Sequence, residues 1–158
     1  MTEGSPITEL CSEKTEKYKA MKPFLLNFPQ RGDERGWLVV VEGNKDVPFD
    51  IKRIFYIYGT EPDIVRGQHA NRNSEFVLVN VAGSCKVRTD DGKGGQQVFE
   101  LNRPNMGLYI PKMVWKDMYD FSADSILLCI ASEVYDPTEY IRDMSEFEKE
   151  VMEGVQNG

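Results

Sequence analysis

Hydrophobic positions fall in short runs along most of the chain, as they do in β-strands of a few residues each. From Phe24 onward, Val, Ile, Phe and Tyr crowd the runs, while Gly, Asn, Asp and Pro crowd the gaps. Many short strands at this spacing predict an all-β sandwich or barrel. The runs are LLNF, WLVVVEG, IKRIFYIYG, EFVLVNVAGSCKVRT, QQVFEL, LYIPKMVWKDMYDF and SILLCIAS, and the gaps between them include RGDERG, NKDVP, DDGKGG and NRPNMG.

Near its C-terminal end the chain changes to a helical pattern. Asp136-Pro137 puts a proline at an early helical position behind a capping aspartate. One apolar stripe then recurs every three or four residues. The sequence therefore predicts a helix over about 137–153 that packs on the strands. The stripe consists of Tyr140, Met144, Phe147 and Val151.

The N-terminal end is different again. Residues 1–20 are polar and of mixed charge, which predicts a flexible tail. No internal repeat or second domain is visible in the remainder. A chain of 158 residues with 41% hydrophobic content is long enough for one core. We therefore predict one domain over 21–158, including the helix.

Charge and cysteine usage exclude several classes of function. Lys+Arg number 19 against 26 Asp+Glu, a net charge of −7, which disfavours general binding to nucleic acids or anionic membranes. No run approaches the length of a membrane span, and no secretory signal precedes the strands. The three cysteines are widely spaced and form no CxxC pair, so neither a disulfide framework nor a thiolate zinc site is indicated. These features predict a cytoplasmic protein.

The chain contains a single histidine, His69, in the stretch from Val65 to Gly83. Its spacing to Asn71 and Glu75 resembles the first motif of cupins, in which an HxH pair, three residues and a glutamate precede a glycine turn. Asn71 stands at the second imidazole, and Trp115 stands where the second cupin motif has its last histidine. One imidazole and one carboxylate are too few for tight transition-metal binding, so we predict no metal site.

A longer series of segments between Phe24 and Phe147 matches a more specific group. In order and spacing they are similar to the small cupin sugar-nucleotide 3,4-ketoisomerases, the FdtA/QdtA type within the WxcM-like group. The matching segments are 32–36 (GDERG), Pro48 with 51–53 (IKR), Tyr56, 66–70 (RGQHA), 83–85 (GSC), 90–92 (DDG), 101–104 (LNRP), 107–109 (GLY), 115–118 (WKDM), 120–122 (DFS), 135–136 (YD) and 140–142 (YIR).

The resemblance implies both a fold and an activity. The fold is a cupin, or RmlC-like, jelly-roll β-barrel with a short C-terminal α-helix. The activity moves the ketone of dTDP-4-keto-6-deoxyglucose from C4 to C3 through an enediol, ahead of transamination in the synthesis of amino sugars for surface polysaccharides. Family members are homodimers that use neither metal nor cofactor, so we expect a homodimer and no cofactor here.

The resemblance also implies roles for three residues. His69 suits the base that takes the C3 proton, because its ordinary pKa lies near neutrality. Tyr56 matches the family's active-site tyrosine and suits a proton shuttle between O3 and O4. The family pattern RG-x-HAH has a second histidine, where this chain has Asn71, whose amide can hydrogen-bond a sugar oxygen or hold an enediolate but cannot exchange a proton at neutral pH. Either His69 with Tyr56 suffices, or the proton takes another route, or the chain is a weak or inactive relative.

Six further residues are candidates for substrate binding. Arg53 and Arg66 could grip a diphosphate. Trp115 could stack on the sugar or base, and Glu75 could supply a carboxylate, since alternation places it on the strand face of His69 and Asn71. By resemblance, Trp37 and Lys116 border the sugar and select the C4 face that is reprotonated.

Three other functions stay open at this point. A non-catalytic nucleotide-sugar-binding protein could have kept the pocket and lost the chemistry with Asn71. A 3,5-epimerase-like enzyme would exchange the proton at C5 instead. A metal-dependent cupin would have to use His69 and Glu75.

Overall fold

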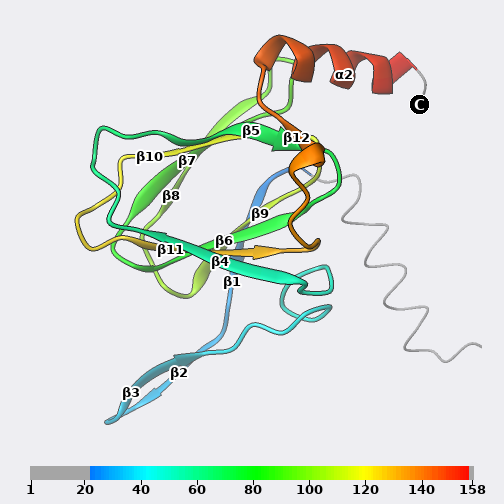
Figure 1. Cartoon of the computed structure of the whole chain (residues 1–158). Coiled ribbons are helices and arrows are strands. Elements are labelled where there is room, and N and C mark those ends of the chain that lie inside the picture. The colour runs from blue at the N-terminus through cyan, green and yellow to red at the C-terminus, as the bar shows by residue number, and fades with distance from the viewer. Residues whose placement is uncertain (1–21, 157–158) are drawn as a thin grey trace, which may run out of the picture.

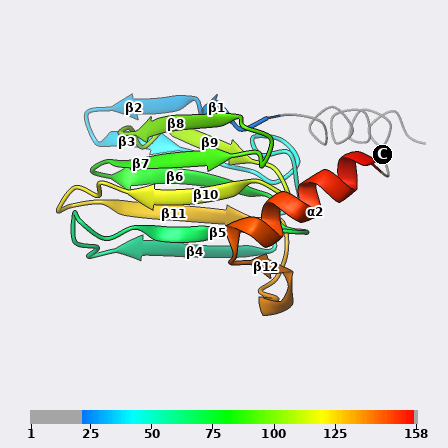
Figure 2. The ribbon, with the colours of Figure 1, turned by 90° about the horizontal axis from the view of Figure 1, so that it is seen from above.

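The computed structural model describes residues 22–156, so the predicted tail over 1–20 lies outside the described part. Two five-stranded antiparallel sheets face each other, and one helix, α2, crosses the outside of the second sheet (Figures 1 and 2). The chain passes back and forth between the two sheets from β4 to β12, as in a jelly roll. The predicted all-β jelly-roll class with a C-terminal helix is confirmed. No helix within 22–156 is long and apolar enough to cross a membrane.

The first sheet has the strand order β1-β9-β6-β11-β4 and the second has β12-β5-β10-β7-β8. The strands of the first sheet are β1 (Phe24–Asn27), β9 (Met106–Ile110), β6 (Phe76–Ala82), β11 (Ile126–Ala131) and β4 (Arg53–Tyr58). Those of the second are β12 (Tyr140–Ile141), β5 (Arg66–Asn71), β10 (Trp115–Tyr119), β7 (Cys85–Asp90) and β8 (Gln96–Leu101).

The main core lies between the two sheets. Along β6, Phe76 and Leu78 face this core, while Val77 and Val79 face a second cluster on the outside of the first sheet. Both faces of β6 are therefore buried, which explains its nearly continuous hydrophobic sequence. The second cluster also contains Phe49, from the segment that leads into β4.

The C-terminal helix is shorter than predicted. Pro137–Glu139 forms a single 3-10 turn (η1), capped by Asp136, whose side chain accepts a hydrogen bond from the Thr138 amide. Tyr140–Ile141 then pairs with β5, and helix α2 (Met144–Gln156) begins after a second cap at Asp143. The prediction of one helix from 137 was wrong because ladder pairing with β5 draws Tyr140 into the second sheet.

The part of α2 that the apolar stripe predicted is nevertheless buried. Phe147 and Val151 pack on Ala70, Trp115 and Ile141, which form the outer face of the second sheet. The helix therefore fixes that sheet from outside, behind the strands that border the main core.

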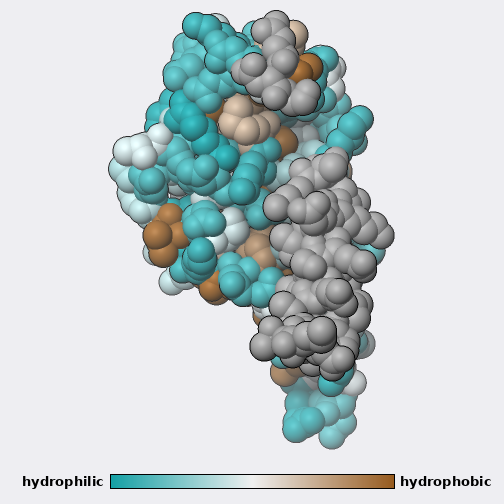
Figure 3. Space-filling model, turned by 90° about the vertical axis from the view of Figure 1, so that its right-hand side faces the viewer, coloured by the Kyte–Doolittle hydropathy of each residue, from teal (hydrophilic) through white to brown (hydrophobic). Residues whose placement is uncertain are grey.

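The gap RGDERG is a β-hairpin rather than a loop. Its strands, β2 (Gln30–Asp33) and β3 (Gly36–Val39), form a separate two-stranded sheet that extends away from the body as an arm (Figure 1). The tip of the arm is mainly hydrophilic on the face seen in Figure 3. Three large apolar side chains of the arm are exposed, namely Trp37, Leu38 and Val40.

Candidate active site

A cavity of about 130 Å³ lies between the two sheets. Mostly apolar side chains form its wall, and only a few groups in it can exchange a proton. The imidazole of His69 and the ammonium of Lys116 both reach it, from β5 and β10. The other lining residues are Phe55, Ile57, Arg66, Gly67, Phe76, Leu78, Met118, Cys129 and Tyr140.

The backbone of β5 is irregular where it borders the cavity. Gly67 and Gln68 both have positive φ values, 83° and 56°, and the pairing with β10 shifts register at Lys116. A Cβ at Gly67 would lie 2.7 Å from the carbonyl oxygen of Lys116, so only glycine fits there. This bulge sets the direction in which the following residue, His69, leaves the strand.

His69 is held as a neutral base. Its Nδ1 lies 2.9 Å from the carbonyl oxygen of Gly67, which can only accept, so Nδ1 carries the hydrogen and Nε2 has the free lone pair. Burial, with a smaller contribution from the charge of Lys116, lowers the pKa of His69 to about 4. The Tyr140 ring packs 4.8 Å from the imidazole, centre to centre. At neutral pH the imidazole can therefore accept a proton.

Lys116 is a buried cation with no carboxylate of residues 22–156 in direct contact. It is only 3% exposed, and its Nζ donates to Oδ1 of Asn71 at 2.8 Å. The same Nζ lies 4.7 Å above the Phe76 ring. Burial lowers the pKa of Lys116 to about 7, an effect that the charge of Glu139 partly opposes.

Asn71 lies behind Lys116 rather than on the cavity wall. Its amide Nδ2 donates to Oε1 of Glu139 at 3.0 Å, and Asn71 is fully buried. The position that carries a histidine in the family pattern therefore links Lys116 to a buried carboxylate. Three of the residues singled out in the sequence, His69, Asn71 and Lys116, therefore lie close together, with Lys116 paired to His69 across the two strands and bonded to Asn71.

Glu139 was not foreseen from the sequence. Its side chain is buried and accepts hydrogen bonds from the amides of Asn73 and Ser74, each at 2.9 Å, and from the Ser74 hydroxyl. A glutamate one residue before a predicted apolar stripe looks like an ordinary helix residue. Only the pairing of β12 with β5 reveals that it lies beside Asn71.

The two candidate arginines lie at the cavity in different ways. Arg66 lines it directly. The guanidinium of Arg53 packs 5.4 Å and 6.0 Å from the rings of Phe55 and Phe76, both of which line the cavity, and 5.5 Å from that of Tyr135. Nε and Nη2 of Arg53 are buried and have no hydrogen-bond partner within 22–156. Such donors are suited to an anionic or hydroxyl-bearing ligand.

Tyr56 does not reach the cavity. On β4 the residues that line it are Phe55 and Ile57, so Tyr56 points to the opposite face of the sheet. It is 63% exposed and stacks on Tyr58, with 6.1 Å between ring centres. The expectation that Tyr56 shuttles a proton beside His69 is not met within this chain, because alternation turns the side chain outward.

Glu75 also lies away from the cavity. β5 ends at Asn71, and a bend separates it from β6 of the other sheet, so the alternation that begins at His69 does not continue to Glu75. The Tyr109 hydroxyl donates to Oε1 of Glu75 at 2.5 Å. Tyr109 belongs to the cluster on the outside of the first sheet, which places Glu75 at that side.

Neither of the two tryptophans lines the cavity with His69. Trp115 is buried outside the cavity, where it packs on Phe147 of α2 and donates from Nε1 to Asp117 at 3.1 Å. It faces away because its neighbour Lys116 faces inward.

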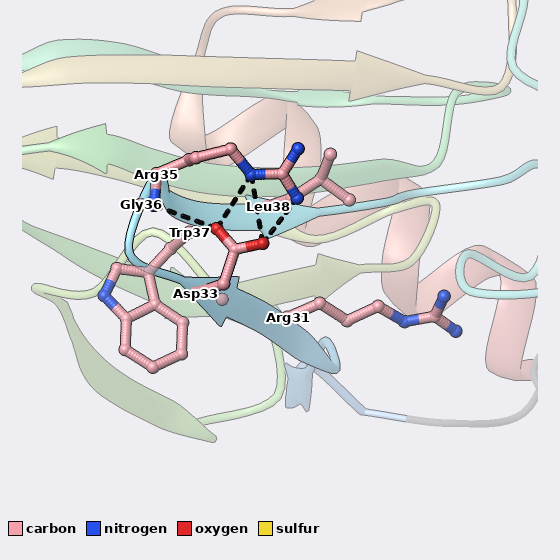
Figure 4. Close-up of a pocket in the computed structure, with 7 residues that line it drawn as sticks. Arg31, Asp33, Arg35, Gly36, Trp37 and Leu38 are labelled. Carbon is pink, nitrogen blue, oxygen red and sulfur yellow. Dashed lines mark hydrogen bonds and ion pairs between the residues drawn. The ribbon is translucent and has the colours of Figure 1, made fainter.

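Trp37 projects from the arm and is 74% exposed. It borders a hollow of about 480 Å³ that is formed by the hairpin alone (Figure 4). Asp33 and Arg35 pair with each other across this hollow, so their charges are already matched. The one carboxylate among the described residues that line this hollow, Asp33, is neutralised by Arg35, in contrast to the free imidazole at the cavity with His69.

Two other chemistries find little support at the cavity. Within 22–156, no group of three or more His, Cys, Asp and Glu side chains is arranged to hold a metal ion. Burial raises the pKa of Cys129 to about 12, so this thiol is protonated and a poor nucleophile. A neutral imidazole and a buried ammonium, both facing a small apolar cavity, are instead suited to proton transfer at a carbon beside a carbonyl.

Comparison with known proteins gives a consistent result. A curated TDP-4-oxo-6-deoxy-alpha-D-glucose-3,4-oxoisomerase from Aneurinibacillus thermoaerophilus is 44% identical over 129 residues, which cover 82% of this chain and 92% of that protein. A 3,4-ketoisomerase from Helicobacter canadensis superposes with a TM-score of 0.81 at 45% identity, covering 84% of this chain and 98% of that one.

Two further structures extend the comparison. A histidine-to-asparagine mutant of the 3,4-ketoisomerase QdtA from Thermoanaerobacterium thermosaccharolyticum, in complex with TDP-4-keto-6-deoxyglucose, has a TM-score of 0.81 at 39% identity, over 84% of this chain and 95% of that one. A dTDP-4-dehydrorhamnose 3,5-epimerase from Bacillus anthracis, at 17% identity and a TM-score of 0.66 over 75% of this chain and 76% of that one, shares the fold. The model of the FdtA family (WxcM-like, C-terminal) matches residues 21–152, and the chain belongs to this family.

Proposed function

We propose that this chain is a sugar-nucleotide 3,4-ketoisomerase that acts on a TDP-linked 4-keto-6-deoxyhexose. The observation that carries the proposal is the neutral imidazole of His69, with its Nε2 lone pair free, in a cavity that also holds the Lys116 ammonium. Relatives at 44% and 45% identity are named 3,4-oxoisomerase or 3,4-ketoisomerase, which supports the same reaction here.

The reaction is a proton transfer along the sugar ring. The C4 ketone acidifies the neighbouring C3 hydrogen, and Nε2 of His69 removes it while O4 gains a proton, which gives an enediol. Loss of the O3 proton and return of a proton to C4 then leave the ketone at C3. The atoms balance without an oxidant, so neither a redox cofactor nor a metal enters the proposal. The 3-keto product is suited to a later transamination.

The cavity accommodates the sugar rather than the whole substrate. At about 130 Å³ it is smaller than the pockets that enclose drug-sized ligands. We assign the hexose ring to it, with the diphosphate and nucleoside outside. Arg66 at the cavity and the unpartnered donors of Arg53 are our candidates for the groups that bind the diphosphate or the sugar oxygens.

We also propose that the chain acts as a homodimer. The arm and the residue after it expose Leu38 and Val40, and the outer face of edge strand β4 exposes Ile54 and Tyr58. Large apolar side chains that stay exposed in one copy commonly mark a surface at which proteins associate. A second copy would cover this surface. Light scattering should give the mass of two chains, and Leu38→Asp and Ile54→Asp should shift it toward one. Val98→Asp, at an exposed position on β8 of the other sheet, is the matched control.

The cytoplasm is the compartment we propose. Cys85 and Cys129 are free, buried thiols, which persist where thiols stay reduced. The acidic net charge of −7 argues against nucleic acid as a partner.

A labelling experiment tests the function. The protein is incubated with TDP-4-keto-6-deoxyglucose in heavy water and the product is followed by NMR. A 3-keto sugar supports the proposal, and deuterium at C4 then measures how far the His69 imidazolium exchanges its proton with the solvent before it reprotonates the sugar. Exchange at C5 would indicate an epimerase, and binding with neither exchange nor product would indicate a non-catalytic protein. Dialysis against EDTA should leave the rate unchanged, whereas loss of activity that a divalent metal restores would indicate a metal-dependent enzyme.

A further inference from the structure

Lys116 is the second group at the cavity that can exchange a proton, and the mechanism above leaves it without a role. It reaches the cavity from β10, opposite His69 in the register of β10 and β5. Its Nζ donates a hydrogen bond to the neutral amide oxygen of Asn71, and it forms no ion pair with a carboxylate of residues 22–156. A buried cation without a carboxylate in contact is costly for the fold, which makes a structural role a poor explanation.

The orientation of Asn71 is fixed by its other partner. Glu139 can only accept as a carboxylate, so the amide NH₂ of Asn71 must point toward it and the amide oxygen toward Lys116. Glu139 is held in turn by the amides of Asn73 and Ser74. The result is a continuous chain of hydrogen bonds from the backbone through Glu139 and Asn71 to Nζ.

We propose that Lys116 is a catalytic residue that carries the proton between O4 and O3 of the sugar, and that Asn71 and Glu139 are its positioning residues. This inference rests on the proposed 3,4-ketoisomerase function. Lys116 on β10 thereby takes the role of proton shuttle that the family resemblance suggested for Tyr56, whose side chain points outward.

The proton balance closes over one turnover. As Nε2 of His69 takes the C3 hydrogen, the C3–H electron pair forms the C3=C4 double bond, and the Lys116 ammonium donates a proton to O4. The resulting neutral amine accepts the proton of the O3 hydroxyl as the C3 ketone forms. The His69 imidazolium gives its proton to C4. Both residues return to their starting states, and no other reactant is required.

The charges around Lys116 suit this role. Burial lowers its pKa to about 7, so that the ammonium and the amine are of similar stability near neutral pH. The groups that face it are Glu139 in η1, Cys129 on β11 and His69 on β5, with Arg66 also at the cavity. Glu139 raises the pKa of Lys116, and Cys129 is protonated. The rate should therefore fall on the alkaline side, where Lys116 loses the proton of its ammonium form.

Two substitutions of Lys116 test the proposal. Lys116→Arg keeps the positive charge but cannot release a proton at neutral pH, and Lys116→Met removes the charge while keeping an unbranched apolar chain. Both should lower kcat at pH 7 by about 100-fold or more, with affinity for TDP within about threefold of the unchanged protein. The unchanged protein should lose kcat as pH rises above about 7, and Lys116→Arg should show no such alkaline limb.

The outcomes separate this inference from the function on which it rests. If the unchanged protein makes no 3-keto sugar, the proposed function fails. If it does so and Lys116→Arg is comparably active, only the shuttle role is overturned.

Glu139→Gln gives a second, independent readout. Loss of its negative charge should move the alkaline limb to lower pH, because that charge raises the pKa of Lys116. If Glu139 had only a structural role, Glu139→Gln would yield less folded protein but would leave the alkaline limb of the pH–rate profile at the same pH. That result would contradict the positioning role. Circular dichroism and TDP affinity show that each variant is folded.

Discussion

Nδ1 of His69 lies 2.9 Å from the carbonyl oxygen of Gly67, two residues earlier on the same strand. The carbonyl fixes the tautomer, and the bulge at Gly67 fixes the direction of the ring. The sequence RGQHA thus builds the base and its orientation within five consecutive residues.

Substitution of the imidazole is the first prediction. His69→Asn should lower kcat by about 100-fold or more, because an amide cannot exchange a proton at neutral pH, and should leave TDP affinity nearly unchanged. Turnover by NMR and calorimetric titration with TDP measure the two effects. Unchanged turnover would remove His69 from the mechanism.

Folding stability should depend on pH through the same residue. The pKa of His69 is about 4 in the folded protein and ordinarily near 6.5, so between these values the unfolded chain binds more protons. The free energy of unfolding should therefore fall as pH decreases from about 6.5 to about 4, by at most roughly 1 kcal/mol per pH unit from this group.

Urea denaturation of the unchanged protein and of His69→Gln at several pH values measures this contribution. The chain has a single histidine, so the difference between the two proteins isolates it from the carboxylates. Parallel pH profiles for the two proteins would show that His69 is not buried as a neutral group. Tyr56→Phe, which keeps the histidine, is the control.

Removal of the exposed hydroxyl on β4 should have little effect on the chemistry. Tyr56→Phe should leave kcat within about threefold of the unchanged protein, because the side chain points away from the cavity. Steady-state kinetics at pH 7 is the measurement. A loss of about 100-fold would mean that Tyr56 contacts the substrate in the assembled enzyme, and it would restore the assignment made from the sequence.

Tyr56, Glu75 and Trp115 show what sequence patterns can and cannot determine. The all-β class and the position of His69 were predictable, because runs, turns and one distinctive segment specify them. The family resemblance suggested Tyr56 and the indole chemistry suggested Trp115, but neither signal says which face of a strand is inside, and both side chains lie off the cavity wall of this chain. Glu75 was misplaced because alternation was extended across a bend between two sheets. Glu139 depends on strand pairing across 68 residues, which no local pattern encodes.

The contact between Trp115 and α2 predicts an effect on stability alone. Trp115→Ala should lower the free energy of unfolding by roughly 3–5 kcal/mol, since it removes a buried indole that packs on Phe147. Trp115→Phe keeps most of this packing and should cost less. In both variants the folded fraction should retain the KM of the unchanged protein. A rise in KM for Trp115→Phe without loss of stability would place the indole at the substrate instead.

Asn71→His restores the family pattern and should not by itself raise activity. An imidazole at this position can accept from Lys116 and donate to Glu139, so it can replace the amide in the same hydrogen-bond chain. With Lys116 present, kcat should change by less than about threefold, because the shuttle is already in place. In the Lys116→Met background, the same histidine should recover at least about tenfold of the lost kcat, since it then supplies a nearby group that titrates near neutrality. A large gain from Asn71→His alone would mean that the missing imidazole, not Lys116, limits the enzyme. No recovery in the double variant would mean that position 71 is too far behind the cavity wall to reach the sugar oxygens.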